Sequence, residues 1–463
     1  MREFVKHIHF VGMGGIGMSG IAEVLLEQGY KVTGSDLRDS PALQRLARLG
    51  AKTMIGHVEQ NSQDADVVVT SSAVDKNNPE VAAARKNKIP VVPRAEMLGE
   101  LMRFRQGIAI AGTHGKTTTT SLVSSVLIKA GLDPTFVIGG IVNSVDSNAR
   151  LGQGEILVAE ADESDASFLQ LTPTIAAVTN IDYDHMQTYE NSFAKLKRTF
   201  VQFLHKLPFY GLAILCFDDP VVREVAQKIN RRILSYGFDD DVDIQAANFR
   251  QDGHISHFDV VRHGINVGQF SLAMPGKHNV LNALVAIAIA SKLGVKDQDV
   301  RDALLEFKGI VRRFSILGDA VFSDTKRALV VDDYAHHPRE LSATFEAAKD
   351  CWPDRNIITL FQPHRYSRTQ ELFDDFAKVL GEQENLILLE VYGAGETPRV
   401  GADGRALANA IRARGGQVVF VENFEEASSI IAHQIKQNDV LLCLGAGDIG
   451  RYAQSLIAES SHV

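Results

Sequence analysis

A short run of glycines, a lysine and threonines has the residue types of a phosphate-binding loop. Gly112-Thr113-His114-Gly115-Lys116-Thr117 follows the apolar run at residues 108–111 and precedes a stretch with helical spacing. Glycines let backbone N–H groups approach phosphate oxygens, and the N-terminus of the following helix adds partial positive charge. Lys116 supplies an ammonium group and Thr117 a hydroxyl that can bind a metal ion. The motif therefore predicts ATP binding.

The loop departs from the common P-loop pattern, because the residue five before Gly115 is Ile110 and not glycine. The alternative interpretation is a glycine-rich turn that only connects a strand to a helix. Lysine and threonine follow Gly115 directly, and this favours the phosphate loop.

A second glycine-rich loop lies near the N-terminus. Gly12, Gly14 and Gly17 follow the strand expected at residues 7–11 and open a helix, and Asp36 ends the next strand. This spacing predicts a pyrophosphate site of the dinucleotide-binding type. An NAD dehydrogenase would have the same pattern, whereas an ATP loop downstream favours a UDP-sugar.

Other polar residues follow expected strands. Ser71 and Ser72 follow the third strand, where hydroxyls contact a ligand or form a turn or helix cap. Glu160 ends an apolar strand and is the candidate Mg²⁺ ligand, although residues 160–165 could instead be a solvated acidic loop. His185 follows a similar strand and either binds a second metal ion or is only hydrogen-bonded in a loop.

Asn279 and Asn282 lie at the start of an expected helix that continues to Leu293. Residues three apart share a helix face, so both amides could contact a nucleotide base or phosphate. Helix capping would explain Asn279 alone but would leave Asn282 unexplained.

Short apolar strands alternate with amphipathic helical stretches, which predicts an α/β fold with mostly parallel sheets. A chain of 463 residues predicts about three domains. We expect their boundaries near residues 93–107 and 308–313, giving domains 1–105, 106–312 and 313–463. Residues 239–270 alternate with period two, which predicts an antiparallel excursion in the middle domain.

The composition restricts location and partners. A net charge of −9 argues against nonspecific nucleic-acid binding. The longest apolar run, residues 283–290, is too short to cross a bilayer and predicts a buried helix face. The N-terminus has no signal-peptide pattern, and the three cysteines have no metal spacing. We expect buried cysteines in a cytoplasmic protein that does not insert into membranes.

Six motifs together resemble the Mur ligases, and they cover all three expected domains. They are Gly-Thr-His-Gly-Lys-Thr-Thr-Thr, Glu-Ala-Asp-Glu-Ser-Asp, Asn-Ile-Asp-x-Asp-His-Met, Pro-Gly-x-His-Asn-x-x-Asn-Ala, Arg-Arg-Phe and Asp-Asp-Tyr-Ala-His-His-Pro. The resemblance implies a Rossmann-like N-terminal domain for the UDP-sugar, a central P-loop ATPase domain and a C-terminal Rossmann-like domain for the amino acid.

The resemblance also implies site residues. Catalytic roles fall on Lys116, Glu160, His185, Arg313 and Asp333, and metal binding on Thr117, Glu160 and His185. The implied ATP site comprises Gly112, Thr113, His114, Gly115, Lys116, Thr117, Thr118, His278, Asn279 and Asn282. The implied UDP-sugar site comprises Gly12, Gly14, Gly15, Gly17, Asp36, Ser71 and Ser72. The implied amino-acid site comprises Tyr334, His364, Arg365 and Arg368.

Within the family, the motifs are most similar to members that join L-alanine to the lactyl carboxylate of UDP-N-acetylmuramate. This similarity implies ATP and Mg²⁺ as cofactors, an acyl-phosphate intermediate, and a monomer or weak homodimer. His364 or an acidic neighbour would take the proton of the amine. The family's carbamoylated lysine is assigned to neither Lys195 nor Lys197.

Three other functions remain open at this point. A ligase that joins a ready-made tripeptide to the same sugar nucleotide is the nearest alternative within the family. An NAD-dependent dehydrogenase and a non-catalytic nucleotide switch are alternatives from other classes.

Overall fold

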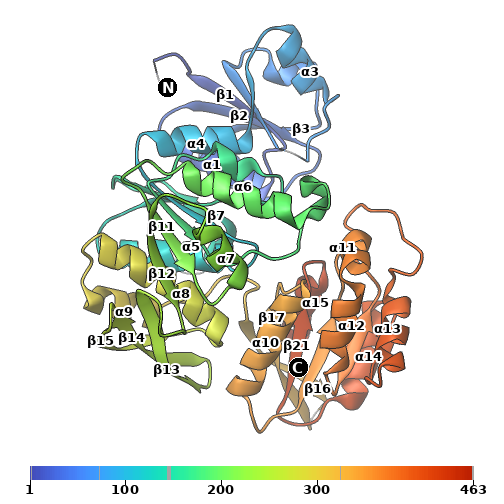
Figure 1. Cartoon of the computed structure of the whole chain (residues 1–463). Helices are drawn as coiled ribbons and strands as arrows, with labels where there is room; N and C mark the ends of the chain where they lie inside the picture. Colours follow the sequence, from blue (N-terminus) through green and yellow to red (C-terminus); the bar gives the residue numbers. More distant parts are fainter. Residues whose placement is uncertain (2, 72, 143–146, 324, 461–463) are drawn as a thin grey trace. The chain divides into compact units, whose positions relative to one another are not determined.

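The computed structural model describes every residue except 2, 72, 143–146, 324 and 461–463 (Figure 1). The chain forms two compact units. The first comprises Met1–Asn248, Phe258–Phe270 and Leu281–Lys308, and the second comprises Phe249–His257, Ser271–Val280 and Gly309–Val463.

The N-terminal sheet of the first unit has five parallel strands in the order β3-β2-β1-β4-β5. The strands are β1 (His7–Val11), β2 (Lys31–Asp36), β3 (Lys52–Ile55), β4 (Val67–Thr70) and β5 (Val91–Pro93). The helices are α1 (Ile16–Glu27), α2 (Pro41–Arg48), α3 (Pro79–Lys86) and α4 (Arg94–Arg103). The strand order reverses direction at β1, and ligands of open parallel sheets bind at the strands' carboxyl ends near such a switch point.

The middle sheet has ten strands in the order β15-β14-β13-β12-β11-β10-β6-β9-β7-β8. Its bounds are β6 (Gln106–Ala111), β7 (Thr135–Val142), β8 (Ser147–Arg150), β9 (Ile156–Glu160), β10 (Ile175–Val178), β11 (Leu212–Cys216), β12 (Arg232–Gly237), β13 (Ile244–Asp252), β14 (Ile255–Arg262) and β15 (Ile265–Leu272). The associated helices are α5 (Lys116–Lys129), α6 (Phe193–His205), α7 (Pro220–Ala226), α8 (Lys277–Lys292) and α9 (Asp297–Leu305), with 3-10 turns η2 (Ser167–Gln170) and η3 (Met186–Tyr189).

The central strands of this sheet are parallel and buried, since helices cover both faces. At one edge, two-residue turns connect β13 to β14 and β14 to β15. Such short connections join antiparallel strands, and His263 and Gly264 have the positive φ angles of a tight hairpin turn. The predicted antiparallel excursion is therefore confirmed.

Direct contacts join the N-terminal and middle sheets within the first unit. The side chain of Asn148 on β8 donates a 2.7 Å hydrogen bond to the carbonyl of Ile16 on α1. The backbone N–H of Leu151 donates to the carboxylate of Glu27 at the other end of α1. Helix α1 thus lies between the two sheets.

The second unit contains a six-stranded sheet in the order β16-β17-β21-β18-β19-β20, in which β16 alone runs antiparallel to its neighbour. The strands are β16 (Ser315–Ser323), β17 (Lys326–Asp333), β18 (Ile357–Phe361), β19 (Leu386–Leu389), β20 (Val419–Val421) and β21 (Asp439–Leu444). The helices are α10 (Pro338–Cys351), α11 (Tyr366–Glu371), α12 (Phe373–Gly381), α13 (Gly404–Ala413), α14 (Phe424–Gln434) and α15 (Ile449–Ser460).

The predicted α/β class with mostly parallel sheets is confirmed. Residues 283–290 form the buried part of α8, and Cys216, Cys351 and Cys443 are buried with thiol pKa values raised by burial. In the part of the chain that the structure describes, no helix has the length and apolar character needed to cross a bilayer. The boundaries expected at residues 105 and 312 stay predictions.

Candidate functional site

The predicted phosphate loop connects β6 to α5. Gly112 and Gly115 have φ angles of +128° and +83°, in the region that favours glycine. A Cβ atom on Gly112 would lie 2.1 Å from the hydroxyl oxygen of Thr179, and one on Gly115 would lie 2.5 Å from the side-chain oxygen of Asn282. Helix α5 begins at Lys116, so its N-terminal N–H groups point towards the loop. The space above the loop can therefore hold an anion.

Asn180, which follows β10, holds this loop in place. Its side-chain oxygen accepts a 2.8 Å hydrogen bond from the backbone N–H of His114, and its amide nitrogen donates to the carbonyl of the same residue. Its own carbonyl accepts from the N–H of Thr113. Asp182 contacts the loop as well, because its N–H donates to the Thr113 hydroxyl.

Lys116 forms an ion pair with Glu163 that the sequence did not reveal. The Nζ atom lies 2.7 and 2.9 Å from the two carboxylate oxygens, and it also donates to the carbonyls of Gly112 and Thr113. Burial works against the charge on Lys116, but the carboxylates of Glu163 and Asp162 outweigh it and raise the lysine's pKa. Burial also raises the pKa of Glu163, against the effect of Lys116. The lysine is therefore held as a cation beside the loop.

Among the acidic residues 160–165, the strand pattern singles out Glu160 alone. Glu160 ends β9, where it pairs in register with Ile110 of β6, and it is one of the charges that raise the pKa of Lys116. The same run of acidic residues was the sequence signal that could have indicated Glu163. Only the turn after β9 decides which of them faces the lysine.

His185 precedes η3 and has a φ angle of +55°. Its Nε2 atom lies 3.4 Å from the Asp184 carboxylate, and its side chain is one-third exposed. The η3 turn is attached to the acidic segment, because the hydroxyl of Tyr189 donates to the carbonyl of Glu163. The hydroxyl of Thr188 donates to the carbonyl of Ser164 at 2.6 Å.

The two asparagines of α8 have different environments. Asn282 accepts a 3.1 Å hydrogen bond from the Thr119 hydroxyl and lies against Gly115, so it joins α8 to the phosphate loop. Asn279 donates from its side-chain amide to the carbonyl of Pro275, just before the start of the helix. His278 belongs to the second unit and is half-buried, and desolvation lowers its pKa to about 4.

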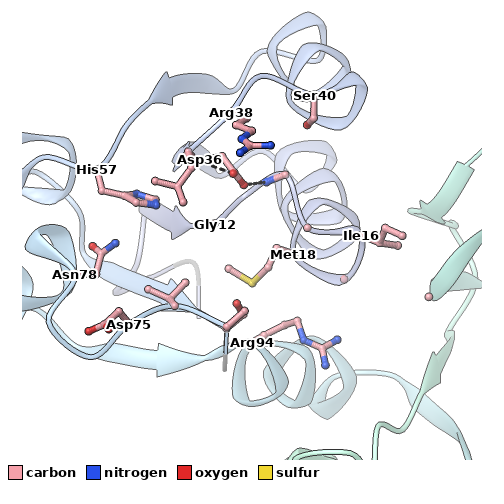
Figure 2. Close-up of a pocket in the computed structure, with 18 of the residues that line it drawn as sticks. Gly12, Ile16, Met18, Asp36, Arg38, Ser40, His57, Asp75, Asn78 and Arg94 are labelled. Atoms are coloured by element: carbon pink, nitrogen blue, oxygen red, sulfur yellow. Dashed lines mark hydrogen bonds between the residues drawn. The ribbon is translucent and has the colours of Figure 1, made fainter. Parts of the chain in front are cut away.

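A pocket of about 1060 Å³ opens at the carboxyl ends of the N-terminal strands (Figure 2). Gly12, Gly14, Gly15 and Gly17 line it, as the fingerprint predicts. Asp36 also lines it, and its carboxylate accepts a 2.8 Å hydrogen bond from the N–H of Gly14. The aspartate therefore fixes the glycine loop as well as facing the pocket.

The opposite side of the pocket comes from the middle sheet. Glu160 and Asp162 are part of its wall, so one cavity extends from the glycine loop to the acidic segment beside the phosphate loop. Arg94 links these two ends, because its guanidinium lies against Gly17 and is 3.4 Å from the Asp162 carboxylate. Ser71 lines the pocket, whereas Ser72 lies outside the described residues.

Three basic side chains of this wall were missed by sequence reasoning. They are Arg38, His57 and Arg94. Each follows a strand of the N-terminal sheet, the same signal that selected Asp36 and Ser71. The loops after these strands differ too much in length to show from the sequence which residue faces inward.

In the second unit, aromatic and histidine rings gather at the ends of β17 and β18. Tyr334 makes an edge contact with His336, and His336 with His364, at ring separations of 5.4 and 6.1 Å. Burial, assisted by Arg368 and Arg365, lowers the pKa of His364 to about 4. The four predicted amino-acid-site residues, Tyr334, His364, Arg365 and Arg368, are thus linked by ring contacts and charge interactions, and His336 joins them.

The remaining members of this region lie around Tyr334. Arg312 and Arg313 both place their guanidinium groups about 5 Å from the Tyr334 ring, at 5.0 and 5.2 Å. Asp333 accepts backbone hydrogen bonds from Phe314 and Ala335, and burial raises its pKa to about 6. Arg365 is exposed at the start of α11.

Arg312 has a role that the Arg-Arg-Phe motif did not indicate. It contacts the buried carboxylate of Asp332 at 3.3 Å and donates to the carbonyls of Gly445 and Gly447. A Cβ atom on Gly450 would lie 2.4 Å from its Nε atom. The glycine-rich loop after β21 therefore receives an arginine side chain.

Comparison with known proteins supports this assignment of the fold. Three family models match in chain order: "Mur ligase family, catalytic domain" at residues 7–106, "Mur ligase middle domain" at 110–290 and "Mur ligase, glutamate ligase domain" at 312–447. A Thiobacillus denitrificans protein named UDP-N-acetylmuramate–L-alanine ligase is 55% identical over 457 residues, which is 98% of this chain and 99% of the relative. A Polaromonas protein of the same name is 56% identical over 97% of both chains.

A solved structure gives the same result. UDP-N-acetylmuramate-alanine ligase from Thermotoga maritima superposes with a TM-score of 0.82 at 30% identity, covering 98% of this chain and 99% of that one. Three α/β sheets with a phosphate loop, matched by three family models in chain order, define an ATP-dependent enzyme. The chain belongs to the Mur ligase family, whose members form amide bonds with the energy of ATP.

Proposed function

We propose that this chain joins L-alanine to the lactyl carboxylate of UDP-N-acetylmuramate, with ATP converted to ADP and phosphate. The observation that carries the proposal is the single pocket that extends from the glycine loop to Glu160 and Asp162. A sugar nucleotide with its pyrophosphate at the glycine loop would direct its acid towards the phosphate loop. Relatives more than half identical are named for this reaction.

The sugar acid needs activation, because a carboxylate repels nucleophiles and hydroxide is a poor leaving group. Attack of one carboxylate oxygen on the γ-phosphorus of ATP gives an acyl phosphate and releases ADP. The amine of L-alanine then attacks the acyl carbon and passes its proton to His364 or an acidic neighbour, and phosphate leaves with that oxygen. Lys116, held cationic by Glu163, offsets the charge that develops on the transferred group.

Mg²⁺ fits the residues beside the phosphate loop. Thr117 opens α5 with a hydroxyl, and Glu160 ends the neighbouring strand with a carboxylate, the hard oxygen donors that this ion prefers. We propose these two residues for one ion and His185 for a second. Bound Mg²⁺ would neutralise charge on the nucleotide phosphates and the transferred group.

For the second unit, we propose Tyr334, His364, Arg365 and Arg368 for L-alanine, with His336 added from the structure. Two arginines suit the carboxylate of the amino acid, and neutral His364 leaves the substrate amine without a neighbouring imidazolium. Arg313 and Asp333 are proposed to act on ATP, as the family motifs imply. A cytoplasmic location and a monomeric or weakly dimeric state stay predictions.

The decisive experiment follows oxygen. UDP-N-acetylmuramate labelled with oxygen-18 in its carboxylate is incubated with ATP, L-alanine and the full chain, and the released phosphate is analysed by mass spectrometry. One labelled oxygen in each phosphate is expected. Unlabelled phosphate would contradict an acyl phosphate.

The tripeptide-joining alternative is not favoured. The murein peptide ligase from Psychrobacter arcticus superposes with a TM-score of 0.70 at 25% identity over 99% of both chains, below the values for the L-alanine relatives. A substrate panel separates the two: ADP release should require free L-alanine and should not be supported by the tripeptide.

A further inference from the structure

A chain of buried polar side chains lies behind the wall of the N-terminal pocket. It links Glu80 on α3 to His57, which follows β3 and lines the pocket. Glu80 and His9 are fully buried. Four links lead from the Asp64 carbonyl to Glu80: Asp64 O to His7 Nδ1 at 2.7 Å, His7 Nε2 to Thr33 at 2.9 Å, Thr33 to His9 Nδ1 at 2.8 Å, and His9 Nε2 to Glu80 at 3.1 Å. Two more lead from Glu80 to the pocket: Glu80 to Ser35 at 2.5 Å and Ser35 to His57 Nδ1 at 2.9 Å.

The proton count of this chain is constrained. The four links from the Asp64 carbonyl to Glu80 need four protons, whereas neutral His7, Thr33 and neutral His9 supply only three. The fourth proton makes one histidine an imidazolium or sits on Glu80 and points to His9. In every case, Glu80 has no proton left for Ser35.

The hydroxyl of Ser35 must therefore donate to Glu80. The other oxygen of Glu80 accepts from the side chain of Asn61 at 2.6 Å and from the N–H of Val58 at 3.3 Å, so the carboxylate faces hydrogen-bond donors on both oxygens. With its only proton directed at Glu80, Ser35 can only accept from His57. His57 therefore has a proton on Nδ1, and the neutral tautomer that fits these bonds has its lone pair on Nε2.

The ring of His57 points into the pocket (Figure 2), with its side chain 13% exposed. Asp36 and Asn78 lie nearby on the same side of the pocket. A pyrophosphate bound at the start of α1 would place the attached nucleoside across the ends of β2 and β3, where His57 lies. This step depends on the proposed function, which puts a UDP-sugar in this pocket.

We propose that Glu80, acting through Ser35, fixes the tautomer of His57 so that its Nε2 accepts the N3–H of uracil and rejects cytosine. Uracil presents a donor at N3, whereas cytosine presents a lone pair that would face the lone pair of Nε2. His57 is then a specificity-determining residue, and Ser35 and Glu80 are positioning residues. Removing the acceptor should weaken the binding of uracil relative to cytosine, because the N3–H of uracil would be buried without a hydrogen-bond partner.

The test compares binding of UDP and CDP to the full chain by calorimetry. The unmodified chain should bind UDP at least about tenfold more tightly than CDP. His57→Phe keeps a flat ring without an acceptor, and Ser35→Ala removes the nearer of the two oxygens beside Nδ1, the other being Glu80 Oε1 at 3.6 Å. His57→Phe should reduce the UDP:CDP ratio to about threefold or less while weakening UDP and not CDP, and Ser35→Ala should lower the ratio by a smaller factor. In both variants, the KM for UDP-N-acetylmuramate should rise and kcat should stay unchanged.

Glu23→Gln is the matched control. Glu23 is a buried carboxylate of the same domain that pairs with Arg45 and is not part of the pocket wall, so the ratio should stay unchanged. Glu80→Gln should behave like Ser35→Ala, and if it fails to fold, the other two variants decide.

Two results would overturn the assignment. If His57→Phe still binds UDP and its UDP:CDP ratio equals that of the unmodified chain, the role of His57 is wrong, whereas the proposed function stands. Absence of UDP binding in the unmodified chain would overturn the proposed function together with it.

Discussion

Lys116 is the residue whose charge the site controls most closely. Its removal should lower phosphate release by about two or more orders of magnitude, because it stabilises charge that develops in the transition state. Lys116→Ala leaves Glu163 buried without its cation, so Lys116→Ala combined with Glu163→Gln separates lost chemistry from lost folding. Phosphate release is measured with circular dichroism as the folding check.

Lys129→Ala provides the comparison for this prediction. Lys129 ends the same helix and forms an exposed ion pair with Glu306 at 2.8 Å. Its removal should leave the rate nearly unchanged. A near-normal rate in both Lys116 variants would remove this lysine from the scheme.

The charge state of His364 leads to a prediction on pH dependence. Burial, Arg368 and Arg365 lower its pKa to about 4, so the ring takes up a proton only as the pH falls towards 4 and is neutral above. kcat/KM for L-alanine should therefore show no acid limb from this residue between about pH 5 and 8. His364→Gln should keep the shape of the pH profile in that range. An acid limb centred near pH 6.5 that disappears in His364→Gln would show that His364 titrates in this range and that its charge state controls the rate.

At the scale of elements, the strand-to-helix turn after β6 depends on two glycines that contact different elements. Both have positive φ, but Gly112 lies against Thr179 and Gly115 lies against Asn282 of α8. Gly115→Ala should therefore cost backbone strain and push α8 from the loop, lowering ADP affinity by about tenfold or more. Calorimetric titration with ADP measures the change.

Gly131→Ala isolates the backbone contribution. Gly131 follows the other end of α5 with a φ of +74°, and nothing lies within 4 Å of a Cβ placed there. It should lower stability by about 1 kcal/mol and leave ADP affinity intact. Equal losses of affinity in the two variants would show that contact with Asn282 is unimportant.

Sequence reasoning succeeded where one element determines the result. Glycines at fixed spacing between a strand and a helix predicted both loops, and the residues that end β2 and β9 predicted Asp36 and Glu160. It failed for Glu163, because the fold of a short acidic turn decides which carboxylate meets Lys116. It also missed His57, whose partners Ser35 and Glu80 lie 22 and 23 residues away on other elements.

At the scale of the whole molecule, the N-terminal and middle sheets should unfold together. Asn148 bonds to Ile16, Leu151 to Glu27, and Arg94 pairs with Asp162, so contacts cross between the two sheets at several points of one compact unit. UDP and ADP bind different sheets of this unit in the proposed function. Each should therefore raise the same unfolding transition.

Differential scanning calorimetry of the full chain checks this prediction. Each ligand at about a hundred times its Kd should add about 2.7 kcal/mol to the free energy of unfolding, and the two shifts should add when both are present. Ligands that bind only the folded state stabilise whatever unfolds cooperatively with their site, which here includes both sheets. If UDP raised one transition and ADP another, the two sheets would be separate cooperative units, and the pocket between them would be open to rearrangement during catalysis.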